Sequence, residues 1–87
     1  MSAWRHGADV ARVEVGHRRA VMNLERLDQP PVVLEGAALL IHDLIDGERD
    51  SDAIVAELSD SYPQIPDLAS QVYVCLEQLA NLGIIRR

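Results

Sequence analysis

Three histidines and one cysteine are the side chains of this chain best suited to metal binding or nucleophilic catalysis. His6 lies near the N-terminus, His17 lies in a predicted turn, and His42 lies on the outer face of a predicted helix. Their spacing matches no metal-ligand pattern, and a single cysteine cannot complete a structural zinc site with them. Cys75 falls on the apolar stripe of another predicted helix, where a cysteine behaves as a small buried hydrophobe. We therefore predict no metal site and surface positions for the three histidines.

Asp43 and Asp46 are three residues apart on one helix face, a spacing that can serve acid–base chemistry in a cleft. They flank an apolar stripe on a very small domain, which favours a solvated helix surface instead. The chain contains neither a Gly-rich phosphate loop nor a nucleophile elbow. Trp4, the only tryptophan, lies in a segment without periodicity, which favours a disordered terminus over an anchor for a partner. The sequence thus predicts a protein that is not an enzyme and holds no cofactor.

The charge distribution separates the two halves of the chain. Fourteen acidic residues against eight basic ones, all of them arginine, give a formal net charge of −6. No basic residue occurs from Asp50 to Ile85. A surface that binds nucleic acid needs a patch of Lys or Arg to neutralise phosphates. The C-terminal half cannot supply such a patch, so we predict no nucleic-acid partner.

Length and cysteine content indicate the setting of the protein. The 87 residues correspond to one domain. No apolar run approaches the roughly 20 residues that span a bilayer, and the N-terminus lacks the apolar stretch of a secretory signal. One cysteine cannot form an intramolecular disulfide, which favours a reducing compartment. We expect a cytoplasmic domain at residues 9–87 without membrane contacts, preceded by a flexible N-terminus at residues 1–8.

The first part of this domain shows the alternation of β-strands. From Asp9 the apolar and polar residues alternate, and a short polar break at residues 16–18 predicts a hairpin. A turn at residues 26–30 separates the second strand from a third at residues 31–35. Pro30 and Pro31 cannot donate ladder hydrogen bonds, so this third strand is predicted at a sheet edge. The apolar faces predicted for the first two strands are Ala11, Val13 and Val15, and Ala20, Met22 and Leu24.

After Gly36 the period changes to about 3.6 residues, which predicts three helices. The first ends at Gly47, and the second begins after an N-cap at Asp50 and ends at Pro63. The third has Pro66 in its first turn and ends before a short extended tail. Its core stripe is Leu68, Val72, Cys75, Leu79 and Leu82, with an apolar shoulder of Ala69, Tyr73, Leu76 and Ala80. The predicted fold is α+β: a three-stranded antiparallel sheet followed by three helices.

The segment from Val32 to Ile85 resembles the PqqD-like family. Family members have a strand, an aliphatic helix closing in Leu-Asp-Gly, a capped second helix, and a third helix ending in Leu-x-x-x-Gly-Leu/Ile. The matching stretches are Leu34-Glu35-Gly36-Ala37-Ala38-Leu39-Leu40-Ile41, Leu44-Ile45-Asp46-Gly47-Glu48-Arg49, Ile54-Val55-Ala56-Glu57-Leu58 and Leu79-Ala80-Asn81-Leu82-Gly83-Ile84-Ile85. His42 stands where the family usually has an aromatic residue, and Ile65 where an acidic cap usually precedes the proline. Both departures leave the subfamily open.

The resemblance implies a winged helix-turn-helix-like fold that recognises the leader segment of a ribosomally made precursor peptide. The leader would join the sheet beside the third strand and lie against the third helix. An exposed edge strand is suited to this, because its free backbone groups can pair with an added strand. The peptide-binding residues predicted on this basis are Pro31, Val32, Val33, Leu34, Glu35, Ala69, Val72, Tyr73 and Leu76.

The short acidic chain most resembles the stand-alone leader-binding proteins of split lasso-peptide pathways. That resemblance implies two further partners, a transglutaminase-like cysteine protease that removes the leader and a cyclase that closes the ring. The family also includes chaperones that present a precursor to a radical-SAM enzyme, and this alternative stays open.

Three other interpretations remain open at the level of sequence. A DNA-binding winged helix has similar elements, but its recognition helix needs Arg, Lys, Asn or Gln toward the DNA. Here the third helix offers only Gln71, Gln78 and Asn81, with Asp67 and Glu77 opposing phosphate. An adaptor that uses the same groove for another peptide is also compatible with the composition. The apolar shoulder of the third helix can also serve simply to pack on the sheet.

Overall fold

The computed structural model describes residues 3–87 and contains five strands and three helices in one chain. In order, they are β1 (Arg5–His6), β2 (Val10–Val15), β3 (Arg18–Asn23), β4 (Val32–Leu34), α1 (Ala37–Asp43), α2 (Ser51–Ser61), α3 (Leu68–Asn81) and β5 (Ile85–Arg86). β2, β3 and β4 form an antiparallel sheet in that order, and β1 pairs with β5 in a separate ribbon. The α+β prediction of three strands followed by three helices is confirmed.

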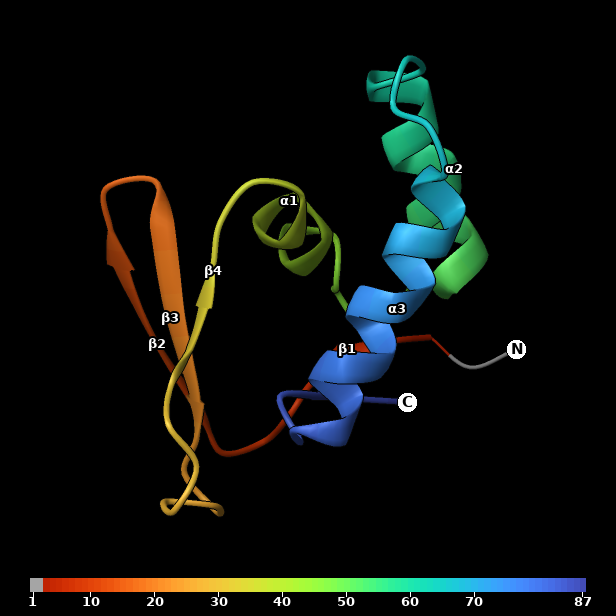
Figure 1. Cartoon of the computed structure of the whole chain (residues 1–87). Helices are drawn as coiled ribbons and strands as arrows, with labels where there is room; N and C mark the ends of the chain where they lie inside the picture. The colour runs from red at the N-terminus through yellow and green to blue at the C-terminus, as the bar shows by residue number, and fades with distance from the viewer. Residues whose placement is uncertain (1–2) are drawn as a thin grey trace.

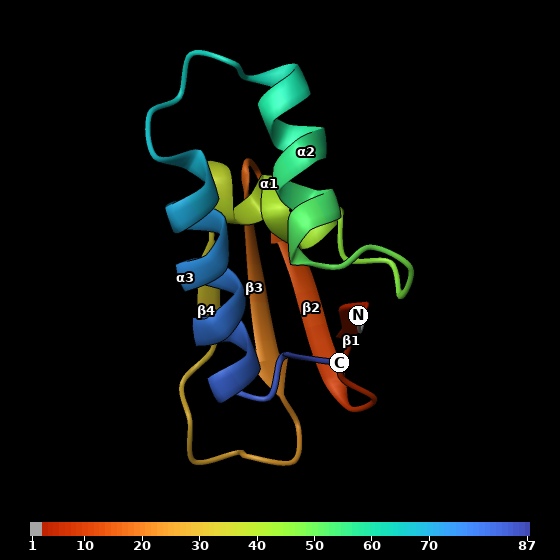
Figure 2. The same ribbon diagram turned by 90° about the vertical axis from the view of Figure 1, so that its right-hand side faces the viewer.

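The sheet and the helices form two sides of the molecule. Figure 1 shows β2, β3 and β4 on one side, with α1 next to the sheet and α2 and α3 beyond it. The 90° view of Figure 2 shows α3 alongside β4 in projection, with the β1–β5 ribbon near β2. The core fills the space between these layers, and its buried members include Val21 and Leu34 from the sheet and Ile41, Ile54 and Val72 from the helices. β4 is an edge strand, as predicted.

The sheet buries the opposite face from the one that the alternation predicted. Arg19, Val21 and Asn23 of β3 face the helices and are buried, whereas Val13 and Val15 of β2 are exposed. The predicted burial of the faces containing Ala11, Val13 and Val15, and Ala20, Met22 and Leu24, is therefore wrong. The apolar pattern misleads because Arg19, although charged, is paired with carboxylates on the helix side and can be buried there. A solvent-facing apolar face remains on the back of the sheet.

The N-terminal segment is part of the fold from Trp4 onward. The Trp4 side chain is buried, its Nε1–H donates to Ser51 Oγ at 2.8 Å, and β1 pairs with β5. The prediction of a flexible terminus is therefore wrong for residues 4–7, while residues 1 and 2 lie outside the described part. No periodicity marks this segment because it contributes one anchoring aromatic and two strand residues.

The helix boundaries follow local signals. The Asp50 carboxylate accepts the N–H of Ala53 at 2.9 Å, which confirms the predicted N-cap of α2. Gly47 and Gly83 have φ of 84° and 75°, consistent with their predicted roles after α1 and α3. α3 begins at Leu68, so Pro66 precedes the helix and is not in its first turn. Within residues 3–87, no helix is long and apolar enough to cross a membrane.

Candidate functional site

The free edge of β4 presents backbone hydrogen-bonding groups at Val33. Leu24 donates its N–H to the carbonyl of Asp9 across the β2–β3 pair, so alternate β3 residues from Arg18 onward face β2. The intervening residues of β3, Arg19 and Val21, therefore face β4. Val33 lies opposite Ala20, which turns its N–H and C=O away from β3. These two groups are oriented to pair with an added strand.

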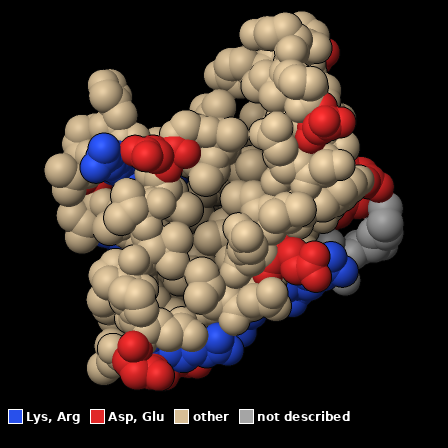
Figure 3. Space-filling view, viewed as in Figure 1, with Lys and Arg blue, Asp and Glu red and all other residues tan. Residues whose placement is uncertain are grey.

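A groove lies at the end of β4, between the first turns of α1 and one flank of α3. We call it the α1–α3 groove; its volume is about 410 Å³. Its lining residues carry no formal charge and are Ala37, Ala38, Ile41, Ser70, Gln71, Val74, Cys75 and Gln78. In Figure 3 the surface between the sheet and the helices is hollowed and tan, with charged side chains at its margins. The groove suits apolar side chains, with Ser and Gln side chains for hydrogen bonds.

The α3 residues predicted to contact a peptide do not line this groove. Val72 and Leu76 are 0% and 1% exposed and belong to the core, so the prediction that they present an accessible surface is wrong. Tyr73 is exposed, but its hydroxyl donates to Asp52 of α2. Ala69 is exposed on the same flank of α3 as Tyr73. The groove lies on the opposite flank, beyond the buried stripe, where Val74 is 54% exposed.

The predicted β4 residues are in place beside the groove. Val33 is 57% exposed, while Leu34 is buried and Val32 is partly buried toward the helices. Pro31 and Glu35 flank the strand and are exposed, and Glu35 pairs with Arg18 at 2.8 Å. Cys75 is half-buried in the groove wall, and burial raises the pKa of its thiol. A neutral thiol of this kind contributes apolar contact and is a poor nucleophile.

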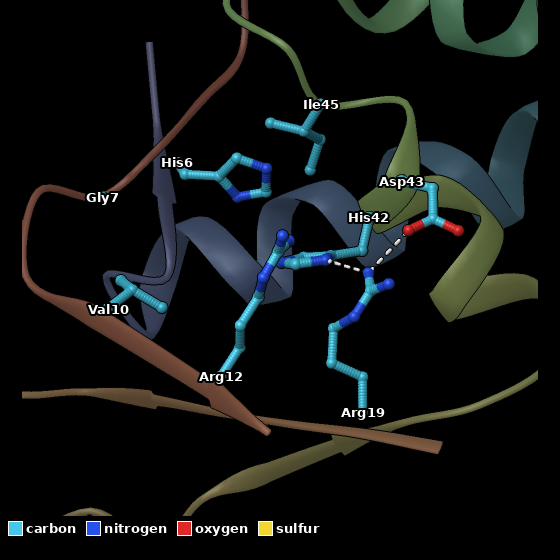
Figure 4. Close-up of a pocket in the computed structure, with 8 residues that line it drawn as sticks. All are labelled: His6, Gly7, Val10, Arg12, Arg19, His42, Asp43 and Ile45. Carbon is cyan, nitrogen blue, oxygen red and sulfur yellow. Dashed lines mark hydrogen bonds and ion pairs between the residues drawn. The ribbon is translucent and has the colours of Figure 1, made fainter. Parts of the chain in front are cut away.

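A second concavity, which we call the His–Arg cavity, lies between β1, the inner face of the sheet and the end of α1. Its volume is about 520 Å³, and its lining residues are His6, Gly7, Val10, Arg12, Arg19, His42, Asp43 and Ile45. Figure 4 shows Arg12 and His6 beside the His42 ring, with Arg19 bonded to His42 and Asp43. Sequence reasoning missed this cavity because the chain segments that form it are far apart.

Arg19 organises the polar side of the cavity. Its Nη1 donates to Asp43 Oδ1 at 2.7 Å and to His42 Nδ1 at 2.8 Å, and its Nε pairs with Glu14. The hydrogen bond with Glu14 raises the pKa of Arg19 further. Because a guanidinium only donates, the Nδ1 atom of His42 must be an acceptor. The proton of the neutral His42 ring therefore sits on Nε2.

His42 is 1% exposed, so the prediction that it lies on the surface is wrong. The face of α1 that carries His42 is not solvated, because His6 of β1 and Arg19 of the sheet cover it. Burial, with Coulomb repulsion from His6, Arg19 and Arg12, lowers the pKa of His42 to about 4. Burial and Arg12 likewise lower the pKa of His6, whose ring lies 4.7 Å from that of His42. Both rings are neutral at pH 7.

The remaining candidates for chemistry have structural roles. Asp46 accepts the N–H groups of Glu48 and Arg49, which lowers its pKa and closes the turn after α1. Asp43 pairs with Arg19 and does not form a carboxylate pair with Asp46. Among residues 3–87, no group of three or more His, Cys, Asp or Glu side chains could hold a metal ion.

Comparison with known proteins identifies relatives by sequence. The sequence profile of the family described as Coenzyme PQQ synthesis protein D (PqqD) matches residues 19–85. A "PqqA binding protein" of Pseudomonas fluorescens is 44% identical over 46 residues, which are 53% of this chain and 50% of that protein. Another "PqqA binding protein", from Pseudomonas syringae pv. tomato, is 36% identical over 69 residues, covering 79% of this chain and 66% of that protein. The chain thus spans about half the length of the first of these relatives.

A solved structure has the same fold. It is described as TbiB1 in complex with the TbiA(beta) leader peptide, and it superposes with a TM-score of 0.77 over 94% of both chains. Its sequence is only 15% identical to this one. The likeness therefore extends to the arrangement of strands and helices.

Proposed function

This chain belongs to the family of coenzyme PQQ synthesis protein D, and from that premise we propose that it binds the leader segment of a ribosomally made precursor peptide. The observation that carries the proposal is the open edge of β4 beside an uncharged groove. A leader in extended conformation would pair with the N–H and C=O of Val33 and extend the sheet by one strand. Main-chain pairing would supply affinity, and the groove would select side chains.

The chemistry of the groove defines the kind of leader that fits. Ala37, Ala38 and Ile41 form one apolar wall, and Val74 and Cys75 form the other. An aliphatic or aromatic leader side chain would be buried between them, while Gln71 and Gln78 would bond to polar groups at the rim. We propose the flank containing Val74 as the contact surface of α3, in place of Tyr73 and Ala69.

The relatives and the fold support this proposal from a different direction. Two sequence relatives are named as binding proteins for PqqA, and the structural neighbour is described in complex with a leader peptide. Binding of a peptide requires no catalytic group, in keeping with a site built from uncharged side chains and backbone.

The experiment is a fluorescence-anisotropy titration with a labelled leader peptide from a small precursor gene encoded beside this one. We expect saturable binding at micromolar affinity, lost when the leader's apolar residues become alanine and unaffected by the core peptide. Amide chemical-shift changes should map to Val33, Val74 and Gln78. Shifts confined to the β2 edge, or no binding by the folded protein, would contradict the proposal.

A narrower proposal concerns the pathway. We propose that the precursor is a lasso peptide and that this protein delivers it to a transglutaminase-like cysteine protease and then a cyclase. The support is the resemblance of this acidic chain to stand-alone leader-binding proteins of split pathways. Leader cleavage by the neighbouring protease should accelerate when this protein is added. Acceleration of a radical-SAM enzyme instead would assign the chain to the alternative pathway.

A further inference from the structure

The His–Arg cavity contains a buried hydrogen-bond donor that the protein itself leaves unused. With Nδ1 accepting from Arg19, the Nε2 of His42 carries a proton, and this atom has no partner among residues 3–87. The ring is 1% exposed, and Nε2 is closed off from solvent. A buried donor without an acceptor is unfavourable, so an acceptor that reaches Nε2 is stabilised there.

Arg12 supplies the charge that an acceptor would meet first. It projects from β2 beside His42 and forms no ion pair or hydrogen bond with any other residue of the described chain. Arg19, by contrast, is occupied by Glu14, Asp43 and His42. Of the two arginines that line the cavity, Arg12 is therefore the one whose charge has no partner among residues 3–87. The Arg12 side chain is exposed, so it can swing outward and admit a group to the His42 ring.

We propose that the His–Arg cavity binds a single carboxylate group, with Arg12 as its ionic partner and the Nε2–H of His42 as its second donor. One free guanidinium matches one negative charge, whereas a phosphate dianion would have only half its charge neutralised beside the Asp43 carboxylate, which also lines the cavity. A carboxylate has two oxygens that can accept from two different donors. The proposal does not depend on leader binding, because the cavity shares no lining residue with the α1–α3 groove.

The carboxylate could come from an Asp or Glu side chain or from the C-terminus of a partner chain. Two probes separate these sources: N-acetylglutamic acid amide presents a side-chain carboxylate, and N-acetylglycine presents a terminal one. Each is titrated at pH 7 and constant ionic strength into the full chain with labelled histidines. The imidazole resonances of His42 and His6 are followed by NMR, with inorganic phosphate as the competing anion.

We expect saturable shifts of the His42 resonances in the millimolar range with at least one carboxylate probe. Bound carboxylate should also raise the apparent pKa of His42. Arg12→Gln should weaken binding about tenfold through loss of a charge-assisted hydrogen bond. Arg18→Gln removes the same charge from an exposed arginine on the neighbouring strand and should leave binding unchanged. Both variants alter exposed side chains, so the fold should persist.

Three results would overturn the proposal. The first is the absence of saturable shifts at His42 with either probe. The second is an equal loss of carboxylate affinity in Arg12→Gln and Arg18→Gln, because the overall charge of the protein would then explain the binding. The third is tighter binding of phosphate than of both carboxylates, which would contradict the charge assignment. Leader binding is measured in a separate titration, so failure of the carboxylate proposal would leave the proposed leader binding unaffected.

Discussion

The two edges of the same sheet border surfaces of opposite chemistry. β4 is short and adjoins the α1–α3 groove, whose lining carries no charged side chain. β2 is twice as long and adjoins the His–Arg cavity, where Arg12, Arg19, His42 and Asp43 converge. Both edges have unpaired backbone groups, so the free edge alone does not define a binding site. The neighbouring side chains decide that an apolar strand suits β4 and a carboxylate suits the β2 side.

This comparison also separates stability from affinity. The β2 side is held by buried contacts between distant segments, including Trp4, Arg19 and His42. The β4 side keeps exposed side chains such as Val33 and Val74. Substitutions of these buried residues should therefore change the free energy of unfolding, and substitutions of exposed residues on the β4 side should change peptide affinity.

The largest effect is expected at Trp4. Trp4→Ala removes a buried aromatic ring, its bond to Ser51 and its contact with Arg87, so the free energy of unfolding should fall by about 3–5 kcal/mol. Urea denaturation measures this loss. Leu27→Ala is the control, because Leu27 is 71% exposed and its loss should cost less than about 0.5 kcal/mol. A change below about 1 kcal/mol for Trp4→Ala would mean that residues 4–7 are not integral to the fold.

The next effect concerns acid and His42. Its pKa of about 4 in the folded protein lies below the ordinary value of 6.5, so protonation favours the unfolded chain. Above pH 6.5 His42 is neutral in both the folded and the unfolded chain and costs no stability. The free energy of unfolding then decreases as the pH falls toward 4. The loss should reach about 3 kcal/mol at most. His6, whose pKa is also lowered, should add to it in the same direction.

Urea denaturation at several pH values checks this expectation. His42→Gln keeps an acceptor for Arg19 but does not titrate, so its stability profile should be flatter than that of the natural chain between pH 6.5 and 4. Asp46 and other carboxylates titrate in both proteins, so the difference between the two profiles isolates His42. If the stability of both proteins fell in parallel with pH, His42 would not have the lowered pKa that its burial requires.

Affinity for the leader should depend most on the α3 wall of the groove. Val74→Asp places an unpaired carboxylate where an apolar leader side chain would be buried, and binding should weaken about 100-fold, or about 2.7 kcal/mol. Ala69→Asp makes the same change of charge on the opposite flank of α3 and should alter affinity less than about twofold. Anisotropy titrations of both variants compare the two flanks directly. A larger loss of affinity for Ala69→Asp than for Val74→Asp would indicate that the leader contacts the flank of α3 containing Tyr73.

The two flanks of α3 also show the limit of sequence reasoning for this fold. Helical periodicity identified the buried stripe at Leu68, Val72 and Leu79, because burial is decided by apolar spacing. It then favoured the more apolar shoulder, at Ala69 and Tyr73, as a binding surface. Which flank meets α1 depends on the rotation of the packed helix, and that rotation is a tertiary property. The groove flank is marked only weakly in sequence, by Val74 among Ser and Gln residues.

The sheet shows a similar limit for a different reason. Turn chemistry and two prolines predicted the hairpin and the edge position of β4, since these are local properties. The face of the sheet that packs on the helices could not be predicted by apolar alternation. Burial of Arg19 requires carboxylates from β2 and α1 and the ring of His42, and sequence distance hides these partners. The His–Arg cavity could not be predicted from the sequence for the same reason.

The smallest effect on leader affinity is expected from a change in the backbone of β4. Val33→Pro removes one outward-facing N–H and leaves the ladder to β3 intact, because that N–H does not face β3. Leader affinity should fall about tenfold, or about 1.4 kcal/mol, since one hydrogen bond is lost and the ring obstructs the added strand. Val33→Thr keeps the N–H and should retain affinity. Arg12→Pro makes the matching change at an outward-facing position of β2, where the side chain is exposed and has no partner among residues 3–87, and it should leave leader binding unaltered. If Arg12→Pro were as damaging to leader affinity as Val33→Pro, the leader would pair with both edges or with neither. The difference between the α1–α3 groove beside β4 and the His–Arg cavity beside β2 would then have no bearing on peptide recognition.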